Sequence, residues 1–422
     1  MNIPRNISRL PFVLVVAAAA CLDLFSASVR AQTAFPTPAG HADCEANAIN
    51  DSLGVVGGCV PANANGSLVA TYASSPAGAQ TILQALSPGR PCVATGLPNN
   101  NAVIGSCENA GGALLGVVWL TPASAPVTLA PLPALKGALT QLFADVSSMP
   151  TAYNENGAVV GASTSVGDVD TAVLWPPGTG SGAAMVVVST YGDNCEAVDV
   201  NGVNINGRPT IALNCPAGLT GGSPGTRVGK VAINNALLGG YQLYSLPIPA
   251  NATNCTVSGI NDALQLVGTC RFANQDSPQT AYWASPGSAP KLLVVSDSGR
   301  NEGHFINAGG KIAFSYQKAD GDIESGFWNP AGAAPAYVPD LPGGSQCEAV
   351  GLGDNDTMVL DCENANEQQQ VAKWTASGGT VALGYLNGGT TASPTALNKS
   401  GTAASITGED SQENEVAGYV GL

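Results

Sequence analysis

Ten of the eleven cysteines fall into five successive pairs, and this pattern constrains the fold more than any other feature of the chain. Four pairs have the same separation of 15 residues, 44/59, 92/107, 255/270 and 347/362, and the fifth, 195/215, is five residues longer. The midpoint of each 15-residue pair falls on a turn signal, such as Asp51-Ser52 or Asp262-Ala263. Two residues equidistant from a tight turn face each other across a β-hairpin, close enough for a disulfide. We therefore predict five disulfides, each within one hairpin: Cys44–Cys59, Cys92–Cys107, Cys195–Cys215, Cys255–Cys270 and Cys347–Cys362.

Metal binding is the other common use of paired cysteines. Zinc sites use short C-x₂₋₄-C spacings, and none occurs here. The two histidines, His41 and His304, are too few for a multi-histidine site. In an exported chain this pattern favours disulfides over free thiols.

Export is predicted from residues 1–31. Arg5 and Arg9 precede an apolar run over residues 10–21, and Val29-Arg30-Ala31 fits a small-residue cleavage site before Gln32. A membrane anchor is disfavoured because Asp23 interrupts the run. Lipidation at Cys21 is a minor alternative. We predict a secreted, periplasmic or cell-surface protein with no integral membrane segment after signal removal.

Aligning the cysteine pairs reveals an internal repeat. Ala48–Gly57 reads A-I-N-D-S-L-G-V-V-G and Ala152–Gly161 reads A-Y-N-E-N-G-A-V-V-G, each predicting a strand, a turn and a second strand. A third predicted strand carries an aromatic residue once per unit, at Tyr72, Trp119, Trp175, Trp283, Trp328, Trp374 and Tyr419, with Val228 assigned to this position in the fourth unit. We interpret these residues as core between units rather than as a ligand platform.

Four short strands in roughly 50 residues, repeated eight times, predict an all-β fold, an eight-bladed β-propeller with seven blades as the alternative. Residues 32–422 are expected to form one domain, with units near 44–91, 92–147, 148–194, 195–254, 255–300, 301–346, 347–391 and 392–422 plus 32–37. The last unit lacks a fourth strand. The segment Gln32–Pro36 is expected to supply it and to close the ring.

The repeat resembles the extracellular family named for its H-A-F tripeptide, whose unit runs approximately A-I-N-N-x-G-x-V-V-G and then H-A-F-x-W. The first half is matched at Ala48–Gly57, Ala152–Gly161, Ala232–Gly239 and Ala396–Gly401, and the second at Thr171–Trp175, Thr280–Trp283 and Ser325–Trp328. The histidine of the family's name is absent from all three of these second-half matches. The resemblance implies a propeller-like fold and transfers no catalytic residue.

Charge and composition exclude some function classes. Lys and Arg number 15 against 30 Asp and Glu, a net charge of −15, which argues against a nucleic-acid partner. Acidic residues recur in the loops that join second to third strands, at Asp168 and Asp170, at Asp320, Asp322 and Glu324, and at Glu409, Asp410, Glu413 and Glu415. The run Asp320, Asp322 and Glu324 is a weak candidate for a calcium site, with solvated turn acids as the favoured alternative. No other cofactor is expected.

A Ser-His-Asp site would need His41 or His304, and a lone histidine is more often structural than catalytic, so we assign no catalytic residue. The favoured function is a secreted binding or scaffolding module for an extracellular protein or glycan, acting through the loop face. The alternative is a polysaccharide-active hydrolase or lyase, for which Arg90, Arg208, Arg271 and Arg300 are the few basic residues near predicted loops.

Overall fold

The computed structural model describes residues 32–63, 66–74, 78–133, 145–178, 186–218, 226–237, 239–273, 275–295, 300–332 and 334–422. The predicted leader over residues 1–31, with its cleavage site and Cys21, lies outside the described residues. Every regular element within the described ranges is a β-strand, which confirms the all-β prediction. Among these residues there is no helix long and apolar enough to cross a bilayer.

The strands form four-stranded antiparallel units in which neighbours in the chain are neighbours in the sheet. The first unit contains β2 (His41–Ile49), β3 (Val55–Pro61), β4 (Val69–Ala73) and β5 (Thr81–Ile82). The second contains β6 (Cys92–Gly96), β7 (Val103–Glu108), β8 (Leu114–Trp119) and β9 (Val127–Thr128). The third contains β10 (Asp145–Tyr153), β11 (Val159–Ser165), β12 (Asp170–Trp175) and β13 (Val186–Val187). The fourth contains β14 (Glu196–Ile205), β15 (Arg208–Pro216), β16 (Arg227–Asn235) and β17 (Gly240–Ser245).

The remaining units repeat this arrangement. The fifth contains β18 (Ala252–Ile260), β19 (Leu266–Phe272), β20 (Gln275–Trp283) and β21 (Lys291–Leu292). The sixth contains β22 (Asn301–Ile306), β23 (Ile312–Gln317), β24 (Ile323–Trp328) and β25 (Ala336–Tyr337). The seventh contains β26 (Cys347–Leu352), β27 (Met358–Glu363), β28 (Gln369–Thr375) and β29 (Gly379–Ala382). In the last, β30 (Ala392–Leu397), β31 (Ala403–Glu409) and β32 (Glu415–Gly421) are joined by β1 (Thr33–Ala34), which pairs with β32.

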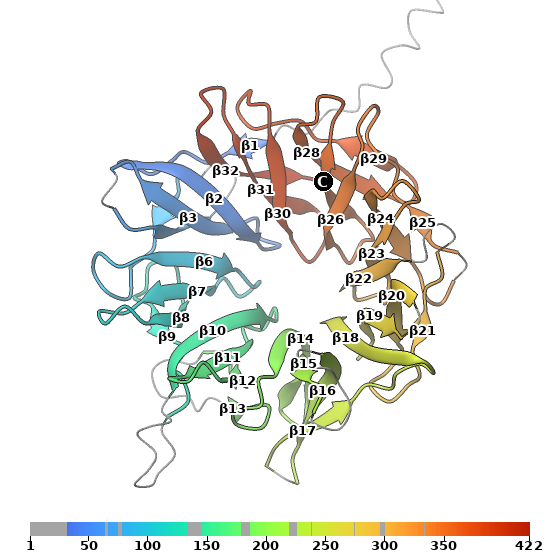
Figure 1. Cartoon of the computed structure of the whole chain (residues 1–422). Coiled ribbons are helices and arrows are strands. Elements are labelled where there is room, and N and C mark those ends of the chain that lie inside the picture. The colour runs from blue at the N-terminus through green and yellow to red at the C-terminus, as the bar shows by residue number, and fades with distance from the viewer. Residues whose placement is uncertain are drawn as a thin grey trace, which may run out of the picture.

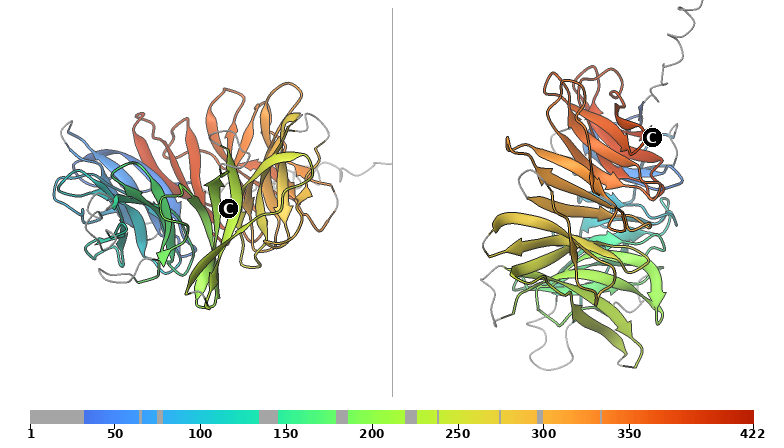
Figure 2. Two further views of the ribbon diagram at one scale, coloured as in Figure 1. Left: turned by 60° about the horizontal axis from the view of Figure 1, so that its bottom comes forward. Right: turned by 90° about the vertical axis from the view of Figure 1, so that its right-hand side faces the viewer.

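The units are arranged around a common centre, with the first strand of each unit innermost (Figure 1). Figure 2 shows the same arrangement from two further sides. The first and last units lie side by side: the backbone N–H of Ala46 donates to Oγ1 of Thr407 at 3.0 Å, and Ala46 is buried in one cluster with Ala403 and Ala417. Units two and three are joined into one sheet by a single parallel pair, Ser148 and Leu115.

The ten cysteines form the five pairs that their spacing predicts, with Cα–Cα distances of 4.0–4.2 Å. Each pair joins the first and second strands of one unit. In the third unit, Ser148 and Ser163 occupy the same opposed positions. Their hydroxyl groups are buried and hydrogen-bonded, Ser148 donating to the carbonyl of Leu129 and Ser163 to the carboxylate of Asp145. Polar contacts therefore replace the disulfide in this unit.

The third-strand aromatic residues lie in the core between units, as predicted. Trp283 is fully buried with Ala212 and Val231 of the preceding unit, and its indole N–H donates to the carbonyl of Pro247 at 2.8 Å. Trp119 makes the equivalent bond to the carbonyl of Gln84.

The assignment of Val228 to this position in the fourth unit is wrong. Trp283 lies opposite Leu266, the first residue of the second strand and four residues before its cysteine. The corresponding residue opposite Ile211 is Ala232, because Val228 pairs instead with Cys215. The fourth unit therefore packs a small side chain where most other units place Trp.

The first strand of each unit contains a β-bulge. In four units a second-strand glycine faces this bulge, and these are the glycines of the V-V-G pattern or its equivalent: Gly57, Gly105, Gly161 and Gly268. A Cβ atom at Gly268 would lie 1.9 Å from the carbonyl oxygen of Thr256. In these four units the close approach of the bulged strand leaves no room for a Cβ atom, whereas Leu213, Phe314, Leu360 and Ile406 face the bulge in the other four.

The inner hairpin of the fourth unit is longer than the others. Asn201 occupies the usual turn position, accepting a hydrogen bond from the backbone N–H of Thr210, but the strands continue past it. After a second register shift between Val200 and Asn204, the hairpin ends in a turn at Asn206 and Gly207, both with positive φ. The five additional residues between Cys195 and Cys215 form this extension.

Candidate functional site

A buried asparagine organises the turn between the first and second strands in six units. These residues are Asn50, Asn154, Asn201, Asn261, Asn307 and Asn398, and each is at most 6% exposed. The side-chain oxygen of Asn261, for example, accepts the N–H groups of Ala263 at 3.1 Å and Gln265 at 3.0 Å. This Asx geometry closes the turn without help from neighbouring units.

Four of these asparagines also link their unit to the next, and the first of them, Asn50, donates from Nδ2 to the carbonyl of Pro98 at 3.4 Å. Nδ2 of Asn154 donates to the carbonyl of Asn201 at 2.8 Å, Nδ2 of Asn261 to the carbonyl of Asn307 at 2.9 Å, and Nδ2 of Asn307 to the carbonyl of Gly353 at 3.1 Å. The bonded carbonyl belongs to the corresponding turn residue of the following unit. We call this series of bonds the asparagine ladder. It holds neighbouring turns side by side at four junctions between units, whereas Nδ2 of Asn398 donates within its own turn.

The residue after the ladder position differs from unit to unit. In chain order these residues are Asp51, Asn99, Glu155, Gly202, Asp262, Ala308, Asp354 and Lys399. Several of their side chains accept a hydrogen bond from the backbone of a preceding unit. Asn99 N–H donates to Glu155 Oε2 at 2.7 Å, and Ala308 N–H donates to Asp354 Oδ1 at 2.8 Å. Each carboxylate is therefore positioned by its neighbour's backbone.

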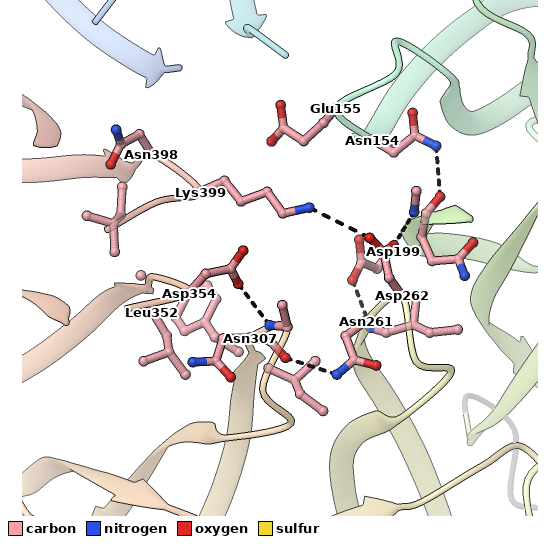
Figure 3. Close-up of a pocket in the computed structure, with 18 of the residues that line it drawn as sticks. Asn154, Glu155, Asp199, Asn261, Asp262, Asn307, Leu352, Asp354, Asn398 and Lys399 are labelled. Carbon is pink, nitrogen blue, oxygen red and sulfur yellow. Dashed lines mark hydrogen bonds and ion pairs between the residues drawn. The ribbon is translucent and has the colours of Figure 1, made fainter. Parts of the chain in front are cut away.

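These turns surround a cavity of about 380 Å³ that is lined by residues of units three to eight (Figure 3). Lys399 extends across the cavity, and its Nζ lies 3.9 Å from Oδ2 of Asp262. Glu155, Asp199 and Asp354 also line the cavity. Four carboxyl groups and one ammonium group give the cavity an acidic lining.

Asp199 lies on β14 rather than in a turn. Its carboxylate accepts N–H groups of Val200 and Ile260, each at 2.8 Å. Burial raises its pKa to about 6, although these two hydrogen bonds lower it. The charge of Asp262 adds to the increase. Burial also raises the pKa of Glu155, opposed by the hydrogen bond from Asn99 and the charge of Lys399. The negative charge of the cavity is therefore expected to decrease below neutral pH.

The predicted loop acids lie at the opposite end of the inner hairpins. Asp320, Asp322 and Glu324 are at the connection between β23 and β24, outside the cavity. Lys318 lies among them, with its Nζ 2.8 Å from Oε1 of Glu324 and 3.9 Å from Oδ2 of Asp322. Within the described ranges no group of three or more His, Cys, Asp or Glu side chains is arranged to hold a metal ion. The structure therefore does not bring the proposed calcium ligands together.

The other acidic loops have the same location. Asp168 and Asp170 lie at the connection of β11 to β12, and Glu409, Asp410, Glu413 and Glu415 at that of β31 to β32. The cavity is instead on the face of the first turns, and the prediction that a ligand binds at the loop face remains a prediction. The repeated Asn-Asp turns marked the residues involved, but their spacing did not indicate that they meet.

Comparison with known proteins tests the fold. The sequence matches no protein-family model and no curated protein. The β-propeller domain of the Trilobed protease from Pyrococcus furiosus is 10% identical, with a TM-score of 0.51 over 82% of this chain and 98% of that chain. The chain is a β-propeller. Its four-stranded units are the blades of that fold, as predicted.

Two further structures show the same likeness. A prolyl endopeptidase is 14% identical, with a TM-score of 0.52 over 81% of this chain and 50% of its own length. Prolyl oligopeptidase B from Galerina marginata is 10% identical, with a TM-score of 0.51 over 87% of this chain and 56% of its own. The chain spans about half the length of these two peptidases. At this identity the likeness shows the propeller fold alone.

Proposed function

We propose that this β-propeller is a secreted binding module of the extracellular HAF-repeat type, and that it holds a protein or glycan ligand at the central cavity. The observation that carries the proposal is the cavity of about 380 Å³ in which Glu155, Asp199, Asp262 and Asp354 surround Lys399. Cavities of this size with a few convergent polar groups are the usual form of small binding sites. The five disulfides fit an oxidising extracellular or periplasmic location.

The acidic lining favours a ligand that presents a positive charge, such as a lysine or arginine side chain of a protein or an amino sugar of a glycan. Complementary charge contributes to specificity and to the rate of association. Lys399 already places one ammonium group beside Asp262. A cationic ligand would take a similar position.

The test uses the mature protein, residues 32–422, on a glycan array and on a set of basic and acidic peptides. For a ligand found in this way, Asp262→Asn combined with Asp354→Asn should weaken binding by about tenfold or more. Asparagine keeps the oxygen that accepts the neighbour's N–H, as Asn99 does in the second blade, where it accepts the N–H of Asp51. The charge is therefore removed with little change in structure.

The matched control is Asp320→Asn with Asp322→Asn on the opposite face, which should leave binding unchanged. Equal loss in both double variants would place the site elsewhere. Release of shortened saccharides from a bound polysaccharide would instead favour the hydrolase or lyase alternative. Mass spectrometry of the exported protein should find Gln32 at the N-terminus, and a lipid-modified Cys21 would replace secretion by surface anchoring.

A further inference from the structure

His304 and Ser315 form a hydrogen-bonded pair outside the central cavity. His304 Nε2 lies 2.8 Å from Ser315 Oγ, joining β22 to β23 within the sixth blade. Both side chains are partly exposed and line a separate cavity of about 150 Å³, which Arg300 and Glu348 also line. A histidine nitrogen at this distance from a serine hydroxyl is the arrangement that activates serine as a nucleophile.

In three other blades each of these two positions has a structural role that it does not have in the sixth blade. His304 is the extra residue of the first-strand bulge. At this position Asn47, Thr151 and Ser258 each donate to a backbone carbonyl of the next blade, at 3.0, 2.6 and 2.6 Å. The imidazole of His304 is bonded instead to a serine of its own blade.

Ser315 departs from the repeat in the same way. It lies three residues after the start of its second strand. The corresponding side chains of three other blades, Asn214, Thr269 and Thr407, each accept a backbone N–H of the next blade. The donors are Val257, Gly303 and Ala46, respectively. In the sixth blade the corresponding N–H, that of Ala349, donates to Oγ of Ser325 at 2.7 Å. A third residue thus performs the structural role, and the hydroxyl of Ser315 remains available to His304.

We propose that Ser315 and His304 are the nucleophile and general base of an esterase site for short-chain carboxylic esters. Ser315 Oγ attacks the ester carbonyl and its proton moves to His304 Nε2. The carbon–oxygen bond to the alcohol breaks, the alcohol leaves with that proton, and an acyl-serine remains. Water then attacks the acyl-serine, giving one proton to Nε2. Ser315 recovers that proton as the acid leaves.

The surroundings suit this chemistry. A cavity of about 150 Å³ is large enough to hold an acetyl-sized group. Arg300 lines the cavity, with its guanidinium 3.8 Å from Glu302 Oε1, and its positive charge would favour the carbonyl oxygen as it becomes negative. Burial lowers the pKa of His304, opposed by the charges of Glu302 and Glu348, so the imidazole is neutral and able to accept a proton at neutral pH.

The experiment treats the mature protein with a fluorophosphonate probe and locates the modified residue by peptide mapping. We expect labelling of Ser315 that is lost in Ser315→Ala and reduced at least 100-fold in rate in His304→Asn. The matched control is Ser106→Ala, the equivalent serine of the second blade, which should label like the unaltered protein. Hydrolysis of p-nitrophenyl acetate should follow the same order and should rise with pH as His304 loses its proton.

Thermal melting of each variant verifies that the fold is retained. The proposal is overturned if the folded, unaltered protein is not labelled, if Ser315→Ala is still labelled at the same rate, or if His304→Asn labels as fast as the unaltered protein. Binding at the central cavity is measured separately with Asp262→Asn and Asp354→Asn. Failure of the esterase proposal would therefore not affect the binding proposal, and the reverse also holds.

Discussion

The backbone N–H of Ser400 donates to Oδ1 of Asp51 at 2.9 Å, which joins the turn of the last blade to that of the first across 349 residues of sequence. Nδ2 of Asn99 also donates to Oδ2 of Asp51 at 2.8 Å. One carboxylate thus bonds to the blade on either side of its own. This is the same blade-to-blade contact that Glu155 and Asp354 make elsewhere in the ring.

Removing this carboxylate should weaken the contact between the first and last blades. We expect Asp51→Ala to lower the free energy of unfolding by about 1 kcal/mol, since a backbone N–H and a side-chain amide each lose their acceptor. Asp51→Asn retains one oxygen and should lose less than half as much. Urea unfolding at pH 7 measures both. Equal losses would show that charge, not the hydrogen bond, makes the contribution.

The pH dependence of this contact follows from the pKa of Asp51. Burial opposes ionisation, but the hydrogen bonds from Ser400 and Asn99 outweigh it and hold the pKa below its usual 3.8. The stabilisation is therefore complete above that value and is lost as pH falls through the lower, folded-state pKa. The difference in stability between the unaltered protein and Asp51→Asn should disappear in strong acid.

Asp199 and Asp361 should have the opposite effect. Burial raises the pKa of each to about 6. The folded state then binds their protons more tightly than the unfolded state does, so the free energy of unfolding should fall as pH rises from about 4 to about 6. Asp361→Asn should reduce this slope, as shown by urea unfolding at pH 4.5 and 7.5. A slope unchanged by the substitution would contradict the assignment to Asp361.

The disulfides should stabilise the blades without being required for folding. We expect replacement of Cys255 and Cys270 by serine to cost about 3 kcal/mol in the chain-entropy account of loop closure. The variant should still fold, because Ser148 and Ser163 occupy these positions in the third blade. Thermal melting and non-reducing peptide mapping measure the loss and verify the other four pairs. Failure of the variant to fold would show that the third blade depends on its own buried hydrogen bonds.

The buried tryptophans should contribute more than any single disulfide. Trp283→Ala should cost about 3–5 kcal/mol because it leaves a large void between the fourth and fifth blades. Trp283→Phe should cost less, since it removes chiefly the hydrogen bond to Pro247. Thermal melting measures both, and a Phe variant as unstable as the Ala variant would assign most of the effect to that bond.

Local sequence predicted the hairpins and their disulfides because both depend on residues a few positions from a turn. The aromatic position was misassigned in three blades. In the fourth, the longer inner hairpin obscured the register, and the residue at this position is Ala232. In the first and last blades the equivalent residues are Ala73 and Val420, next to Tyr72 and Tyr419.

The central cavity could not be predicted in the same way. The sequence identifies Asp262 as a turn residue. Its hydrogen-bond donor is Gly202, 60 residues earlier in the chain, and its ion-pair partner is Lys399, so neither contact is visible in the local sequence.

The longer hairpin of the fourth blade has a practical consequence. Asn201 keeps its ladder position while the chain continues to Asn206 and Gly207, so added length lies beyond the bonds that hold neighbouring turns together. A peptide tag inserted between Asn206 and Gly207 should therefore extend away from the ring and leave its packing intact. Because Asn201 and Gly202 of the same hairpin line the central cavity, a tag at this turn would mark the cavity face of the protein.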